Sequence, residues 1–176
     1  DNDGDGYVDA LNLIHQGAGA EEGDYSNIWS HKSSLGNLAV SYDGVIINSY
    51  NISPEIQNGN IVAIGVLAHE FGHALGLPDL YDTDYSSTGS GKLALMASGS
   101  WGTSGNSPWY PATMVGWCKN ELGWVDVLEI TEDQIDVALE QTYSNSTVIR
   151  VNHSQVEEEY WLIENRQKIG SDTLMP

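Results

Sequence analysis

The chain has 176 residues, of which six are lysine or arginine and 25 are aspartate or glutamate, so its formal net charge is −19. So acidic a surface repels nucleic-acid phosphates and anionic lipid headgroups, which predicts neither a nucleic-acid partner nor membrane insertion. The length suits a single domain with a real core, no stretch is long and apolar enough to span a bilayer, and the single cysteine, Cys118, forms no intrachain disulfide.

The first nine residues have the pattern of a calcium-binding loop. Aspartates occupy positions 1, 3, 5 and 9, and the glycine at position 6 permits the sharp turn that such loops need. The pattern departs from an EF-hand because position 12 is asparagine rather than a bidentate glutamate. Carboxylates this close repel one another without a cation. We therefore predict a structural Ca²⁺ bound by Asp1, Asp3, Asp5, the carbonyl of Tyr7, and Asp9.

The next fifty residues predict little regular structure. Residues 7–17 are expected to form a short strand or the edge of a helix, and residues 18–37 a loop. A buried strand is predicted within residues 42–52, centred on Val45–Ile47. His15 and His31 are expected to be hydrogen-bonded structural residues rather than ligands.

An apolar helix is predicted over about residues 60–75, preceded by the capping cluster Asn58–Asn60. Apolar residues at helical spacing predict a buried stripe made of Ile61, Ile64, Ala68, Phe71 and Leu75. A second stripe is made of Val62, Val66, His69 and His73. Gly65 and Gly72 lower the helix propensity. We expect these two glycines to allow close packing instead.

This helix carries the motif HExxHxxGxxD over residues 69–79. His69 and His73 project from one helix face and can share a Zn²⁺, while Glu70 is placed as the general base for a zinc-bound water. Gly76 can adopt the left-handed conformation that ends a helix, and the proline that follows turns the chain away. That turn can bring Asp79 back as a third ligand. Three protein ligands and an open position are typical of catalytic zinc.

The remaining sequence completes an α+β pattern. Residues 82–92 are expected to form a mobile loop, in which Asp82 and Asp84 give a weak signal for another ion site. A second helix is predicted over 111–122, because Pro111 suits its first turn. Strands are predicted at 147–151 and 159–164.

The chain resembles the immune inhibitor A family of secreted bacterial metallopeptidases, a branch of the metzincin-like zinc peptidases. Besides residues 69–79, the segments that carry the resemblance are Asp1–Asp9, Gly65–Ala68, Leu77–Asp82, Leu95–Trp101, Lys119–Trp124 and Glu164–Gln167.

The resemblance implies a metzincin-like zincin catalytic domain, with a central zinc-binding helix and a mixed sheet. It implies zinc on His69, His73 and Asp79, Glu70 as the catalytic base, and Met96 in a Met-turn beneath the metal. Residues 1–176 would form one catalytic domain, with an upper part of about 1–76, a lower part of about 77–176, and the cleft between them. The resemblance further implies an extracellular bacterial protease, free or at the cell surface, that acts on proteins or peptides. The full-length precursor would add a propeptide and C-terminal modules.

Several alternatives remain open at this stage. Glu121 could replace Asp79 as the third ligand, as in thermolysin-like enzymes. Tyr81 and Tyr110 are candidates for stabilising an oxyanion, and Trp101 and Trp109 for walls of the cleft. The rival function is an inactive, calcium-stabilised surface or adhesion module that retains a zinc site.

Overall fold

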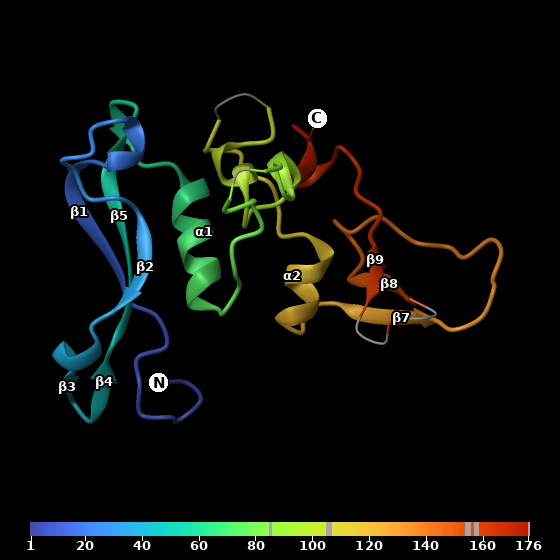
Figure 1. Ribbon diagram of the computed structural model, residues 1–176, viewed down its shortest axis with the longest axis horizontal. Helices are drawn as coiled ribbons and strands as arrows, with labels where there is room; N and C mark the ends of the chain where they lie inside the picture. Colours follow the sequence, from blue (N-terminus) through green and yellow to red (C-terminus); the bar gives the residue numbers. More distant parts are fainter. Residues whose placement is uncertain (85, 105–106, 154–155, 157–158, 176) are drawn as a thin grey trace.

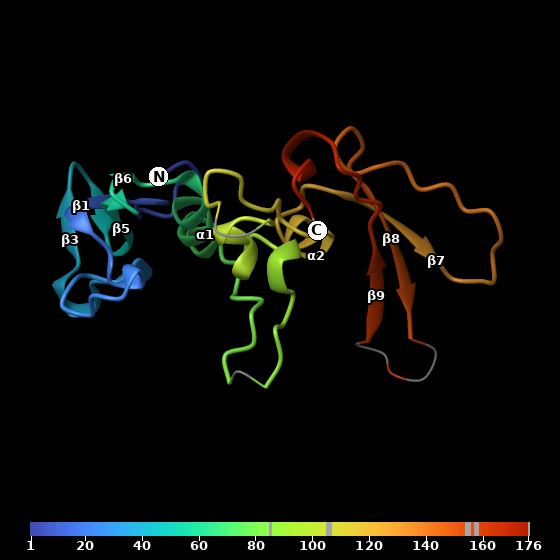
Figure 2. The same cartoon turned by 90° about the horizontal axis from the view of Figure 1, so that it is seen from above.

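The computed structural model describes residues 1–84, 86–104, 107–153, 156 and 159–175. These residues form a mixed α/β structure with two α-helices, α1 (Ile64–Ala74) and α2 (Gly116–Glu121), between an N-terminal and a C-terminal group of strands (Figure 1). Seen from above, the two groups of strands lie at opposite ends of the molecule with the helices between them (Figure 2). The predicted mixture of helices and sheets is confirmed.

The N-terminal sheet is built around one long strand, β5 (Ser49–Gln57). It pairs in parallel with β1 (Asn12–Ala18), antiparallel with β2 (His31–Ser34), and at its end with β6 (Asn60–Ile61). The order β1-β5-β2 leaves β2 at an edge of the sheet, and both β2 and β5 contact α1. This arrangement places the beginning of β2 beside the helix that carries the histidine motif.

A separate hairpin joins β3 (Val40–Tyr42) to β4 (Val45–Ile47). Asp43 and Gly44 both have positive φ, as a two-residue hairpin turn requires. The predicted strand at Val45–Ile47 is confirmed, although its residues are only half-buried.

Two predictions for this part of the chain were wrong. Residues 18–37, expected to be a loop, contain β2 and two short 3₁₀ turns, η1 (Ala20–Glu22) and η2 (Gly36–Leu38). The single strand predicted within residues 42–52 is instead divided between β4 and β5, and β5 continues to Gln57. A proline is uncommon within an inner strand. Pro54 is nevertheless paired with His15, at the point where the register between β1 and β5 shifts, so the ladder is already irregular there.

The predicted helix is present, but its start and its buried face differ from expectation. It begins at Ile64, because Asn60–Ile61 pair with β5 as a strand, and its cap is Ala63 rather than the Asn58–Asn60 cluster. The stripe expected to be buried is largely exposed: Ile61, Ile64, Phe71 and Leu75 are 80%, 56%, 40% and 38% exposed. The buried residues of the helix are Gly65, Val66, His69, Glu70 and Gly72, and two of them, Val66 and His69, belong to the second predicted stripe.

Close packing at the two glycines explains why this face of α1 is the buried one. A Cβ on Gly65 would lie 1.9 Å from the carbonyl oxygen of Ser100, and a Cβ on Gly72 would lie 2.3 Å from Sδ of Met96. Only a helix face that has no side chain at these two points can approach Ser100 and Met96 so closely. The expectation that Gly65 and Gly72 permit close packing is confirmed.

The C-terminal part was partly predicted. Helix α2 begins at Gly116 rather than 111, because the preceding segment is hydrogen-bonded to other loops, with Ala112 N–H donating to Gly99. Strands β8 (Thr147–Asn152) and β9 (Tyr160–Ile163) confirm two predicted strands, whereas β7 (Asp126–Ile130), parallel to β8, was not predicted.

A small core lies between the end of α1 and α2. Its buried members are Leu77, Met96 and Cys118, with partly buried apolar side chains from residues 80–122 around them. Burial raises the pKa of the Cys118 thiol to about 11, so this cysteine is a packing residue rather than a nucleophile. Within the described ranges, no helix has the length and apolar character needed to cross a membrane.

Candidate metal centre

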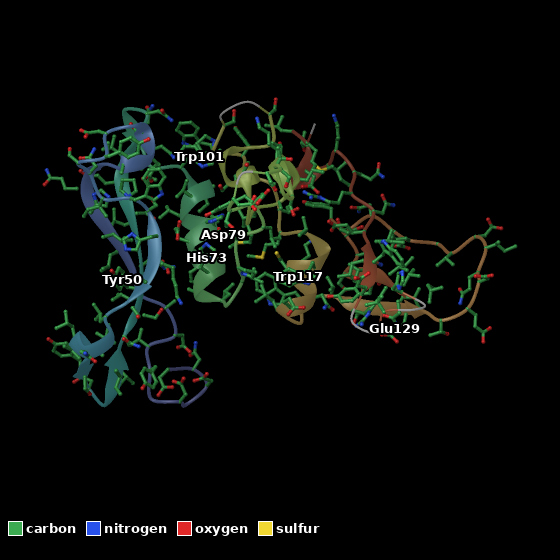
Figure 3. The ribbon with its side chains drawn as sticks, in the orientation of Figure 1. Tyr50, His73, Asp79, Trp101, Trp117 and Glu129 are labelled. Carbon is green, nitrogen blue, oxygen red and sulfur yellow. The ribbon has the colours of Figure 1, made fainter. Side chains whose placement is uncertain are left out.

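Three side chains from the histidine motif meet at one point. Oδ1 of Asp79 lies 3.1 Å from Nε2 of His69 and 3.2 Å from Nε2 of His73. The two imidazole rings stand nearly perpendicular, with their centroids 4.8 Å apart. Figure 3 shows Asp79 beside His73 where the two side chains meet at α1. The sequence motif therefore becomes a compact group of two nitrogens and one oxygen that could hold a metal ion.

Hydrogen bonds to main-chain carbonyls fix the orientation of both rings. Nδ1 of His69 lies 2.9 Å from the carbonyl oxygen of Leu95, and Nδ1 of His73 lies 2.7 Å from that of Leu77. A carbonyl oxygen can only accept, so each Nδ1 must carry a proton and donate it. In a neutral ring the lone pair is then on Nε2, which is the atom that faces Asp79.

The end of α1 brings Asp79 back toward the histidines. The N–H of Gly76 donates to the carbonyl of His73, and the N–H of Leu77 donates to the carbonyl of Gly72. This pair of bonds is a Schellman motif, and it requires a left-handed residue, which Gly76 supplies at φ +96°. The predicted role of Gly76 is confirmed, and the chain reverses within three residues of the helix end.

Glu70 lies on the buried face of α1 and is only 7% exposed. Burial raises the pKa of its carboxyl above the ordinary value. The rings of His69, His73 and His31 oppose that rise, and the Asp79 carboxylate adds to it. A carboxyl whose pKa is raised holds a proton more readily near neutral pH, which suits acid–base chemistry.

The turn that contains Met96 supports the cluster from below. Met96 is fully buried, and its sulfur occupies the space that a Cβ on Gly72 would need. Its neighbour Leu95 supplies the carbonyl that holds His69, and the N–H of Leu80 donates to the carbonyl of Met96 at 2.6 Å. The position of Met96 is thus under the metal-bearing turn, while its role as a Met-turn stays a prediction.

The cluster opens into a cleft of about 490 Å³. The cleft is lined by α1, by residues 97–101 and by the segment that leads into β2; its side chains include Glu21, Trp29, His31, Tyr81, Ser98 and Trp101. Sequence reasoning foresaw Tyr81 and Trp101 here but treated His31 as a structural residue and did not consider Glu21. The segment Trp29–His31 contains two aromatic or ionisable side chains inside an otherwise polar loop, which was the only available signal.

Other candidates lie elsewhere. Glu121 is on the exposed side of α2 and is absent from the possible metal groups found among the described residues. Trp109 and Tyr110 line a different groove, together with Thr173 and Leu174. Asp82 accepts hydrogen bonds from Ser86 and from the backbone of residues 84 and 87, which hold its pKa well below its usual range. The ion site at Asp82 and Asp84 stays a prediction.

The predicted calcium loop brings three carboxylates together. Ligand atoms of Asp1, Asp3 and Asp5 lie within 4.8 Å of one another. The carboxylate of Asp9 lies outside this group and accepts instead from the amino group of Asp1, at 2.8 Å, and from the N–H of Asn2. The N–H of Tyr7 donates to Asp5, and the N–H of the next residue, Val8, donates to Ile46. The loop is thereby joined to the N-terminal strands.

The sequence was compared with known proteins. Residues 1–125 match a family model described as the catalytic domain of the immune inhibitor A peptidases, M6. The chain is 32% identical over 172 residues to immune inhibitor A of Bacillus thuringiensis subsp. alesti, covering 86% of this chain and 25% of that protein. It is 34% identical over 171 residues to the pre-pro-metalloprotease PrtV of Vibrio cholerae serotype O1, covering 81% of this chain and 18% of that protein. The chain therefore spans a quarter or less of the length of these relatives.

Proposed function

The chain belongs to the immune inhibitor A family of M6 peptidases, and we propose that it is the catalytic domain of a zinc-dependent endopeptidase. The observation that carries the proposal is the convergence of two Nε2 atoms and one carboxylate oxygen at 3.1 and 3.2 Å. With neutral rings, all three atoms are acceptors that repel one another. A bound cation removes that repulsion, so the donor set fits a metal.

Zinc is the metal that this donor set favours. Two imidazole nitrogens and one carboxylate oxygen are a catalytic ligand set, because the fourth position stays open. His69, His73 and Asp79 would hold the ion. When bound there, zinc supplies Lewis acidity, which lowers the pKa of water and polarises a carbonyl group.

Glu70 is proposed as the general base. Its carboxylate lines the cleft one residue after His69, and its buried position keeps other proton acceptors such as bulk water away. It accepts a proton from the attacking water and returns that proton to the departing amine.

The substrate is proposed to be an extended segment of a protein or peptide. Strand β2 is an edge strand, and Ser30, His31 and Lys32 at its start line the cleft. Edge strands bind extended peptides through main-chain hydrogen bonds. A peptide paired with β2 would therefore run past Glu70 and past the three predicted zinc ligands, which we call the metal group.

A structural Ca²⁺ in the N-terminal loop is a further part of the proposal. The grouping of Asp1, Asp3 and Asp5 supports it, with the carbonyl of Tyr7 and the carboxylate of Asp9 as additional predicted ligands. We also infer an extracellular location, a propeptide and additional C-terminal modules. These inferences are supported by the greater length of the relatives and by the name of PrtV, a pre-pro-metalloprotease.

The test compares Glu70→Ala with Glu121→Ala in the full-length protein. Zinc content is measured by mass spectrometry and hydrolysis is followed with casein. Glu70→Ala should retain zinc and lose activity, whereas Glu121→Ala should retain both. Substantial turnover by Glu70→Ala would refute the assignment of the base. A wild-type protein that binds no zinc and cleaves no peptide would favour the inactive surface module.

A further inference from the structure

His31 approaches the metal group from the sheet rather than from the helix. It is the first residue of β2, and its ring lines the same cleft as Glu70, His69, His73 and Asp79. Its ring also lies close enough to Glu70 to oppose the rise in the pKa of that carboxyl. Figure 3 shows Tyr50, the neighbour of His31 on β5, on the sheet that faces α1. The ring of His31 is thus within electrostatic reach of the reacting groups.

The ring of His31 is held at one nitrogen and only weakly contacted at the other. Nδ1 lies 2.7 Å from the carbonyl oxygen of Trp29, so Nδ1 must donate to it. Nε2 lies 3.5 Å from the hydroxyl of Tyr50, which is at the limit of a hydrogen bond. The Tyr50 ring meets the His31 ring edge to face, with centroids 5.8 Å apart. These contacts orient the ring and leave Nε2 able to exchange its weak partner for a better one.

The segment before His31 is itself anchored. The Glu21 carboxylate accepts hydrogen bonds from both the N–H and the hydroxyl of Ser30. Because these bonds fix the backbone next to His31, the imidazole is presented to the cleft from a rigid support. Rigid support is what a preorganised hydrogen-bond donor requires.

Other donors near the metal group are less suitable. The hydroxyl of Ser100 already donates to the carbonyl of Ala97. Tyr110, foreseen as a candidate, is 63% exposed and belongs to another groove. Tyr81 stacks on His69, with ring centroids 6.4 Å apart, which places it on the ligand side of the cleft.

We propose that His31 is a catalytic residue, which donates a hydrogen bond from Nε2 to the scissile carbonyl oxygen as negative charge develops on that oxygen. The proposal rests on the proposed endopeptidase function and adds a residue to it. Donation from Nε2 requires the imidazolium form of His31, because the single proton of the neutral ring lies on Nδ1, in the bond to Trp29. In the imidazolium form Nδ1 keeps that bond and Nε2 donates across the cleft. A donor aimed at developing charge stabilises the transition state more than the ground state, so it raises kcat more than it lowers KM.

Two substitutions separate this role from a structural one. His31→Asn places an amide N–H close to the position of Nδ1, so it can keep the bond to Trp29 but has no donor at Nε2. His31→Gln places its amide near Nε2 and loses the bond to Trp29. A catalytic role predicts a larger defect in the Asn variant, and a structural role predicts a larger defect in the Gln variant. His15→Asn, on the other edge of the same sheet, is the matched control.

The experiment measures kcat and KM of the full-length zinc enzyme on an internally quenched peptide, together with zinc content and thermal midpoint. We expect His31→Asn to keep its zinc and to lose about 10²- to 10³-fold in kcat with KM little changed. His31→Gln should recover part of that loss, and a phosphinic peptide that mimics the charged tetrahedral state should bind His31→Asn more weakly than wild type. Wild-type kcat in His31→Asn, or a Gln variant worse than the Asn variant, would overturn the proposal. If the wild-type enzyme itself lacks zinc-dependent hydrolysis, the endopeptidase function fails first and the role of His31 falls with it.

Discussion

Gly65→Ala tests how closely α1 packs against the loop that lines the cleft. Gly65 donates its N–H to the carbonyl of Pro108 at 2.9 Å, and its Cα faces the carbonyl of Ser100. An added Cβ would lie 1.9 Å from the Ser100 oxygen and 2.8 Å from the Pro108 oxygen. Both neighbours are backbone atoms, so neither can rotate out of the way.

The expected change in the free energy of unfolding of Gly65→Ala is the sum of two opposing effects. The helix and the loop must separate by about 1 Å, and overpacking of this kind costs about 3 kcal/mol at the upper end of its usual range. Replacing glycine by alanine inside a helix stabilises the helix by about 1 kcal/mol. We therefore expect the free energy of unfolding to fall by about 2 kcal/mol. Because α1 carries His69 and Glu70, the same displacement should also reduce kcat/KM by up to about 10²-fold.

The assay is urea unfolding of a series of three glycine variants, combined with kcat/KM. A Cβ at Gly72 would meet the side chain of Met96, which can adjust in part, and a Cβ at Gly116 would lie 3.2 Å from Val148. The expected order of destabilisation is Gly65→Ala first, Gly72→Ala second and Gly116→Ala last. If Gly65→Ala were as stable as the wild type, the close approach of α1 to Ser100 would be refuted.

Three further predictions concern the ligands and one buried ion pair. Asp79→Ala should lose or greatly weaken zinc binding in a metal titration while Glu121→Ala binds normally; full zinc binding by Asp79→Ala would move the third ligand elsewhere. Asp3→Asn should weaken calcium binding in calorimetry and reduce the rise in thermal midpoint that calcium produces, and an unchanged calcium response would argue against the loop as the site. The bidentate pair of Arg166 and Asp172 is 9% exposed on each side chain, so Asp172→Asn should cost about 3–5 kcal/mol in urea unfolding. Burial acts to raise the pKa of Asp172, but the hydrogen bonds from Arg166 outweigh it and leave the pKa below its ordinary 3.8. The stability that this pair contributes is therefore complete above pH 3.8 and is lost as the pH falls through the lower pKa of the native state. The Asp172→Asn variant has no carboxylate at this position, so its acid-unfolding curve should lack this loss.

The grouping of His69, His73 and Asp79 was predictable because its geometry is local. His69 and His73 share a helix face at a spacing of four, and the left-handed Gly76 reverses the chain, so eleven consecutive residues determine the arrangement. The same local reasoning located Gly65 and Gly72 as points of close packing. The strands at 147–151 and 159–164 were also predicted, the second from the alternation of its residues, which is a local pattern.

The features that were not predicted depend on contacts between segments that are distant in the sequence. The buried face of α1 was assigned by hydrophobicity to Ile64 and Phe71, whereas the glycine-bearing face makes the closer contact with the loop around Ser100. Strand β5 runs through Pro54, which a local rule would exclude from an inner strand. Likewise, the only local signal at His31 is its place beside Trp29 in a polar segment, and this signal does not indicate that β2 brings His31 to a cleft whose other wall begins more than thirty residues later.

The metal group also shows which parts of the site tolerate sequence change. Both histidine rings are held by main-chain carbonyls, those of Leu77 and Leu95, so no particular side chain is needed to fix their tautomers. The backbone path of the two turns that supply these carbonyls must be preserved. This path depends on the packing of Leu77 against Met96 and on the glycines that let α1 lie close to the loop around Ser100. The geometry of the candidate metal centre therefore depends on small and apolar residues as much as on the ionisable ones. For the same reason, the motif alone indicates the ligands but does not describe the structure that aims them.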